Sequence, residues 1–220
     1  MQARDFLTAA CGDSPEDAKR ASAGLMANRE SAAFMHDVFA VACDPTFPPA
    51  ARQLALLTVK NAPICLTDPR LVPALQSGLP GLLDDPAVAH VVAIVLSHVI
   101  VNGDAAAWFP VYASLVDPWR PTEPLLRCLS FMAQDGSGEV RKAMAAAATL
   151  AARSVAAGEL GDDPARIRHC FVLVARVLGT IGLYKDAEFS AATHSLFSAT
   201  LNVGLVNLGG DADSSMSLLP

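Results

Sequence analysis

Five histidines are the side chains best suited to hold a metal ion or to transfer a proton. They are His36, His90, His98, His169 and His194. No two of them are three or four residues apart, the spacing that points two imidazoles at one metal from a single helix. His90 and His98 fall two turns apart on one helical face. We expect them to contact the core or line a groove, where neighbouring groups satisfy lone histidines.

The other groups that could do chemistry also lack a catalytic arrangement. The single, dispersed cysteines are Cys11, Cys43, Cys65, Cys128 and Cys170. Without a C-x-x-C pair they are expected to be reduced core residues. The turn Gly136–Glu139 lacks phosphate-loop spacing, and no G-x-S-x-G motif occurs. Asp84-Asp85 and Asp162-Asp163 precede predicted helices, whose dipoles they complement. We therefore expect a protein without enzymatic activity, metal or cofactor.

Composition and helix-start signals predict that the chain is built from helices. The chain has 220 residues, 52% of them hydrophobic and only 6% aromatic, which favours close helix packing over a β-sandwich. Ser14-Pro15, Asp85-Pro86 and Asp163-Pro164 each join a capping side chain to a proline suited to the first helical position. The predicted helices span 14–28, 31–43, 48–61, 70–83, 85–102, 105–116, 121–134, 139–157, 163–183 and 186–208.

Charge and hydropathy limit the class of partner. A net charge of −6 argues against a nucleic-acid surface, which needs a basic stripe. The longest apolar run, Val88 to Val101, contains His90, Ser97 and His98 and is shorter than the roughly 18 residues of a membrane span. No secretory signal is expected at the start of the chain. These features predict a soluble intracellular protein that binds neither membrane nor nucleic acid.

The predicted helices pair into repeats. The first members of the pairs begin near residues 14, 48, 85, 121 and 163, a spacing of about 34 to 42 residues that suits HEAT and armadillo repeats. Val88 to Leu96 is apolar around its whole circumference, so neighbours must cover it on several sides. The polar helix 14–28 suits a terminal capping repeat. We expect an all-α solenoid of about five helical pairs over 1–208 and a polar tail over 209–220.

The segment Ala51 to Asn61 carries a family resemblance. It contains Arg52, Ala55 and the pair Lys60-Asn61 in an Arg-x-x-Ala-x-x-x-hydrophobic-Lys-Asn run. This run resembles the second-repeat signature of the importin-β (karyopherin-β) family, with transportin-type importins the most similar. A Trp common after the Lys-Asn pair in that family is replaced here by Ala62-Pro63-Ile64.

Flanking segments extend the resemblance to roughly the first half of the chain. Arg20, Ala21 and Leu25 partly match the first repeat, with Ser22 where an acidic residue is common. Ile94 to Asn102, followed by Gly103-Asp104 and Trp108-Phe109-Pro110, is similar to the third repeat. After Asp117 the likeness is one of architecture.

The resemblance implies a right-handed superhelix whose N-terminal repeats bind the small GTPase Ran in its GTP form and so release import cargo in the nucleus. Cargo and nucleoporins would contact the rest of a longer arch, of which this chain is a piece. The localisation implied is cytoplasm and nucleus, at the nuclear pore. The residues assigned to the Ran contact are Lys60, Asn61, Arg52 and Trp108.

Each of these four residues also has a structural interpretation. Lys60 could be a solvated cation at a helix C-terminus, where its charge interacts favourably with the negative end of the helix dipole. Asn61 could cap the same helix. Arg52 could line a groove, although a bridge to the preceding repeat is preferred, and Trp108 is better explained as a buried anchor than as a partner contact.

Three other functions stay open at this stage. An exportin-type receptor also uses its N-terminal repeats for Ran but loads cargo in the opposite sense. A HEAT-repeat scaffold of another pathway, such as a vesicle coat or a phosphatase, would bind a different partner. An unrecognised all-α enzyme would need titratable groups that converge in a pocket.

Overall fold

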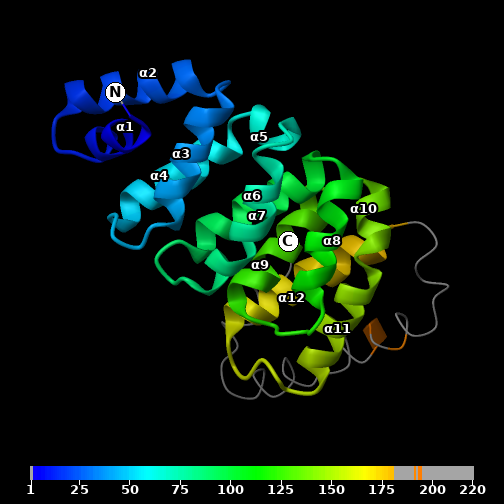
Figure 1. Ribbon diagram of the computed structural model, residues 1–220. Coiled ribbons are helices and arrows are strands. Elements are labelled where there is room, and N and C mark those ends of the chain that lie inside the picture. The colour runs from blue at the N-terminus through cyan, green and yellow to red at the C-terminus, as the bar shows by residue number, and fades with distance from the viewer. Residues whose placement is uncertain (1, 181–190, 192, 195–220) are drawn as a thin grey trace. The chain divides into compact units, whose positions relative to one another are not determined.

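The computed structural model describes residues 2–180, 191, 193 and 194. This part of the chain contains twelve α-helices, one 3-10 helix (η1) and no strand (Figure 1). The elements are α1 (Ala3–Ala10), α2 (Pro15–Asn28), α3 (Ala32–Cys43), α4 (Pro49–Lys60), α5 (Ile64–Thr67), α6 (Val72–Gly78), η1 (Pro80–Asp84), α7 (Ala89–Asn102), α8 (Ala105–Val116), α9 (Glu123–Asp135), α10 (Gly138–Ala143), α11 (Ala145–Ala156) and α12 (Pro164–Leu178). The all-α prediction is confirmed.

Capping side chains determine where several helices begin. The Ser14 hydroxyl accepts a hydrogen bond from the Asp17 N–H at 3.4 Å, and Pro15 occupies the first helical position. Asp163 accepts from two backbone N–H groups at the start of α12. Both predicted starts are confirmed. The predicted start at Asp85-Pro86 was wrong, because α7 begins four residues later, at Ala89. The Asp85 carboxylate accepts a hydrogen bond from the Ala87 N–H in the preceding turn and also pairs with Arg52.

Helix α1 was not predicted, and it changes how the first helices pair. The most extensive helix contacts in this region join α1 to α2 and α3 to α4, whereas α2 and α3, predicted as a pair, are not packed extensively. The Phe6 ring of α1 lies so close to Gly24 of α2 that a Cβ there would sit 2.1 Å from its Cε1 atom. The same ring meets Phe34 of α3 edge-on, with centroids 6.0 Å apart. The first helix of the described residues is therefore α1 rather than α2, and it pairs with α2.

The chain divides into two compact units, Met1–Met132 and Ala133–Pro220. In the first unit, α3 and α4 run side by side (Figure 1), and α7 packs against α4, α5, η1 and α8. Residues on several faces of α7 are buried, including Val92, Val95, Leu96 and Val99. This confirms that the all-round apolar helix is covered by several neighbours.

Helices that are not consecutive in the chain also contact one another within this unit. α1 packs on α3, α3 on α5 and α6, and α6 on α8. In addition, α4 packs on α7. The side chain of Gln76 in α6 reinforces one of these contacts by donating a hydrogen bond to the Ala107 carbonyl of α8. Alternate helices are therefore neighbours along the first unit.

In the second unit, α11 packs against α12. Four alanines on α11, with fully buried side chains, allow close approach of the two helices: Ala147, Ala148, Ala151 and Ala152. The predicted single helix 139–157 is instead broken at Met144, the C-cap of α10 and the N-cap of α11. Of the predicted helix 186–208, only residues 191, 193 and 194 are described, and all three are helical. The predicted tail 209–220 lies outside the described residues. A single solenoid over 1–208 stays a prediction.

Candidate partner-binding surface

The Lys60-Asn61 pair ends α4. Lys60 is the last residue of this helix and is half-buried, while Asn61 is exposed at the C-cap position. The Asn61 N–H donates to the Leu57 carbonyl at 3.1 Å, which satisfies one of the last carbonyls of the helix. A cation at this position is stabilised by the negative end of the helix dipole. Both structural interpretations of the pair are therefore satisfied by the local geometry, and both side chains reach solvent.

An open apolar groove of about 160 Å³ lies between α2 and α4, next to this pair. Its lining residues are Ser22, Leu25, Met26 and Arg29 from α2, and Leu54, Leu57, Thr58 and Asn61 from α4. In each helix these positions follow an i, i+3, i+4, i+7 spacing, which places them on one face. Met26 is 56% exposed and Leu57 is 38% exposed. Two large apolar side chains therefore face solvent from the two helices that line the groove.

Arg29 at the groove, and Lys60 next to the groove residue Asn61 in the chain, have no counter-ion among the residues that the structure describes. Arg29 lines the groove directly, and Lys60 follows Leu57 by three residues, a spacing that makes the two side chains neighbours on the helix surface. Their charges are therefore available to an acidic or carbonyl group of a partner.

Arg52 is held inside the first unit rather than presented to solvent. Its side chain is only 4% exposed. The Nε atom donates to the Ala42 carbonyl of α3 at 3.0 Å, and Nη2 donates to Asp85 Oδ2 at 2.6 Å. The hydrogen bond from Arg52 lowers the pKa of Asp85 below its usual range. Arg52 therefore bridges α4 to the preceding helix, α3, and to the segment before α7, while a bridge to a preceding repeat stays a prediction.

Trp108 is fully buried near the start of α8. Its ring packs on Gly103, where an added Cβ would lie 2.5 Å from both the Trp108 Cδ1 and Nε1 atoms. The ring therefore requires glycine at the turn between α7 and α8. The burial expected of an anchor is confirmed, while a partner contact by any of the four assigned residues stays a prediction.

The cysteines separate into two groups. Cys65, Cys128 and Cys170 are buried, and desolvation by burial raises the pKa of each thiol to about 12. These three are core residues, as predicted, and they stay protonated at neutral pH. Cys11 and Cys43 are exposed, so the prediction that they belong to the core was wrong.

Neither a metal cluster nor a membrane span is found where the structure can be described. Across residues 2–180 and the three positions beyond them, no group of three or more His, Cys, Asp or Glu side chains is placed to hold a metal ion. In the same residues, no helix is long and apolar enough to cross a bilayer.

Comparison of the chain with known protein families, curated proteins and solved structures finds no match.

The structure brings two of the four assigned residues to one surface. Asn61 lines the groove and Lys60 is its neighbour in the chain, whereas Arg52 and Trp108 are buried. Sequence reasoning missed the groove residues Met26 and Leu57. Their helical spacing was readable in advance, but which face of α2 and α4 stays uncovered depends on how the neighbouring helices pack.

Proposed function

We propose that this chain is the Ran-binding part of a nuclear transport receptor of the importin-β type. The observation that carries the proposal is the Lys60-Asn61 pair at the end of α4, accessible to solvent beside an open apolar groove. The partner's identity, Ran in its GTP form, comes from the resemblance of the segment Ala51 to Asn61 to that family. In such a receptor Ran binding releases cargo, and the protein moves between cytoplasm and nucleus.

The chemistry of the groove suits a protein partner. Protein interfaces combine an apolar centre with a polar rim. Here Met26 and Leu57 supply exposed apolar surface, and Ser22, Thr58 and Asn61 supply polar groups that line the same groove. The Lys60 ammonium, which has no ion pair among the described residues, adds a charge that recognises an acidic or carbonyl site on Ran. Cargo and nucleoporins would contact further repeats of a longer arch.

The helix contacts of the first unit support a HEAT-type arrangement as part of this proposal. In a solenoid each repeat contacts its neighbours, so helices of one layer pack on one another along the stack. The contacts of α1 with α3, α3 with α6 and α6 with α8 fit one layer, and those of α4 with α7 fit a second. In this arrangement α1 and α2 form the first pair and α3 and α4 the second. The right hand of the superhelix follows from the resemblance alone.

Reversal of the charge at Lys60 is expected to weaken binding of Ran·GTP while the fold stays intact. Close charge pairs at interfaces couple by on the order of 1.5 kcal/mol or more, so Lys60→Glu should lower the affinity about tenfold. Replacement of a cation by an anion at the helix end should cost the free protein at most about 2 kcal/mol, since each charge contributes up to about 1 kcal/mol there. Isothermal titration calorimetry measures the first effect and thermal melting the second.

Lys142→Glu is a control, because Lys142 is also a cation in the last turn of a helix, α10, and its side chain is exposed. It should bind Ran·GTP with wild-type affinity. Added salt should reduce the difference between wild type and Lys60→Glu if the contact lies at the rim of the interface. Equal affinities of wild type and Lys60→Glu would refute the role given to Lys60, and a loss of folding would show that the residue is structural.

A further inference from the structure

Ser22 of α2 differs from the other serines that the structure describes, because its hydroxyl makes no hydrogen bond. Each of the others caps a helix, as Ser14 and Ser31 do, or bonds to a nearby carbonyl or carboxylate, as Ser97 and Ser154 do. Ser22 is also exposed and lines the groove between α2 and α4. Its hydroxyl is therefore free to attack a group that is delivered from solvent.

Two cations precede Ser22 at the positions that basic-directed protein kinases recognise. The segment reads Lys19-Arg20-Ala21-Ser22, which places positive charges three and two residues before the hydroxyl. Both cationic side chains are exposed. Protein kinases select their substrates through patterns of charge around the acceptor. None of the other described serines has cations at both of these positions.

A kinase binds its acceptor segment in an extended conformation, so α2 must open around Ser22. Among the described helices, α2 packs extensively on α1 alone, and Ala21 and Leu25 are its buried residues. Gly24 lies in its middle, where the Phe6 ring leaves no room for a Cβ, and glycine weakens a helix relative to alanine. Segments with few buried apolar contacts open locally at the lowest free-energy cost.

Arg29 offers a counter-ion to a phosphate attached at Ser22. It lines the same groove and has no ion pair among the described residues. The two residues are two helical turns apart, about 10 Å along the axis. Because helical side chains lean toward the N-terminus, Arg29 extends toward Ser22. A guanidinium group matches the geometry of phosphate oxygens.

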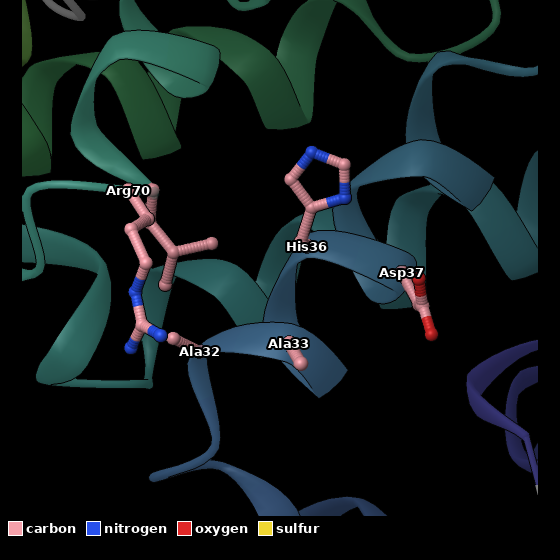
Figure 2. Close-up of a pocket in the computed structure, with 6 residues that line it drawn as sticks. Ala32, Ala33, His36, Asp37 and Arg70 are labelled. Carbon is pink, nitrogen blue, oxygen red and sulfur yellow. The ribbon is translucent and has the colours of Figure 1, made fainter.

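The larger hollow beside α3 lacks both of these components. Arg70 and His36 lie on opposite sides of it (Figure 2), but Nε and Nη2 of Arg70 already donate to the Asp68 carboxylate. No serine or threonine is among its lining residues. Of these two hollows, only the groove between α2 and α4 combines a free hydroxyl with an unpaired guanidinium.

We infer that Ser22 is the acceptor of a basic-directed serine/threonine kinase and that Arg29 holds the resulting phosphate at the groove. The Ser22 Oγ attacks the γ-phosphorus of ATP, the bond to the β-phosphate oxygen breaks and ADP leaves. The hydroxyl proton passes to the catalytic aspartate of the kinase.

The modification changes the charge of the proposed Ran-binding surface. A phosphoserine carries a charge of about −1.5 to −2 at neutral pH. It occupies Arg29 and repels an acidic site on a partner. Phosphorylation therefore lowers the affinity for Ran·GTP, a consequence that rests on the proposed function.

The first test is incubation of the full chain with magnesium ATP and the catalytic subunit of cyclic-AMP-dependent protein kinase, followed by tandem mass spectrometry. Phosphate should appear on Ser22 and not on Ser31, which is exposed and follows Arg29 by two residues but caps a helix. Lys19→Gln combined with Arg20→Gln should lower the rate about tenfold, the effect of losing one close charge pair. An unmodified Ser22, or an unchanged rate in the double variant, would overturn the inference.

A phosphorus-31 nuclear magnetic resonance titration of the phosphorylated chain tests the role of Arg29. The second pKa of the phosphate should be lower in wild type than in Arg29→Gln, because a nearby cation favours the dianion. Arg70→Gln is the control, because Arg70 is another exposed arginine of the first unit. It should leave the phosphate pKa as in wild type. Equal values in wild type and Arg29→Gln would refute the role given to Arg29.

Calorimetric titration separates this inference from the proposed function. If the unmodified chain binds Ran·GTP, the phosphorylated chain should bind it at least about tenfold more weakly. Ser22→Ala treated with the kinase in the same way should bind like the unmodified chain. Equal affinities of the two forms of the wild type would contradict the expected loss of binding. If the unmodified chain does not bind Ran, the proposed function fails, while the phosphorylation site stands on the mass spectrometry and the phosphorus titration.

Discussion

Trp108→Ala should lower the free energy of unfolding by about 3–5 kcal/mol, the usual cost of truncating a fully buried tryptophan. The side chain is 0% exposed and fills the space above Gly103, which an alanine cannot reach. The cavity that remains loses both the burial of the ring and its van der Waals contacts. Urea denaturation followed by circular dichroism measures the loss.

The neighbouring Phe109 supplies the control. It is 52% exposed and contacts Tyr112 with ring centroids 5.6 Å apart, so Phe109→Ala should cost no more than about 1 kcal/mol. An unchanged unfolding midpoint in Trp108→Ala, together with loss of Ran·GTP binding, would instead identify Trp108 as a surface contact.

Arg52→Met should destabilise the first unit by about 2–3 kcal/mol. The substitution removes a hydrogen bond to the Ala42 carbonyl, which is one of the last four carbonyls of α3 and has no partner within that helix. It also leaves Asp85 without its ion pair. Breaking a fully buried pair costs roughly 3–5 kcal/mol, and the expected loss is smaller here because the Asp85 side chain is 28% exposed.

The effect of Arg52→Met should also depend on pH. Arg52 lowers the pKa of Asp85 in the folded protein, so the ion pair stabilises the fold above the unfolded pKa of about 3.9. This contribution is lost as the pH falls through the folded pKa. The difference in unfolding free energy between wild type and Arg52→Met should therefore be largest near neutral pH and shrink below about pH 4.

Arg20→Met is a suitable comparison, because the Arg20–Asp17 pair is exposed and pairs of that kind contribute little to stability. It should unfold close to wild type at every pH. If Arg52→Met were as stable as wild type but failed to bind Ran·GTP, Arg52 would be a partner contact rather than a bridge between helices.

Much of the helical structure was predictable because its signals are local. The start of α8 follows from Asp104, whose side chain caps the helix by accepting from the Ala106 N–H. Ser14-Pro15 likewise determines the start of α2. These signals involve only a few neighbouring residues, so they can be read from the sequence without knowledge of the fold.

What was missed depends on contacts between distant residues. Helix α1 has no proline at its start and is held by packing of Phe6 on Gly24 and Phe34. Asp85 resembles a helix cap in the sequence, but its ion-pair partner, Arg52, lies 33 residues away.

The candidate surface was predictable only at one end. The Lys60-Asn61 pair could be selected by its resemblance to a known repeat. The groove beside it could not, because α2 and α4 have suitable apolar stripes whether or not another helix covers them. Leu25 and Met26 illustrate the difference: they are adjacent in the sequence, yet one is 4% and the other 56% exposed.

The most direct test of the proposed function is calorimetric titration of the full chain with Ran loaded either with a non-hydrolysable GTP analogue or with GDP. If the chain recognises the GTP form, Ran loaded with the GTP analogue should bind saturably. Ran loaded with GDP should bind at least about tenfold more weakly, a difference in binding free energy of roughly 1.4 kcal/mol or more. Failure to bind either form, or equal affinity for both, would contradict the proposal that this chain is the Ran-binding part of a nuclear transport receptor.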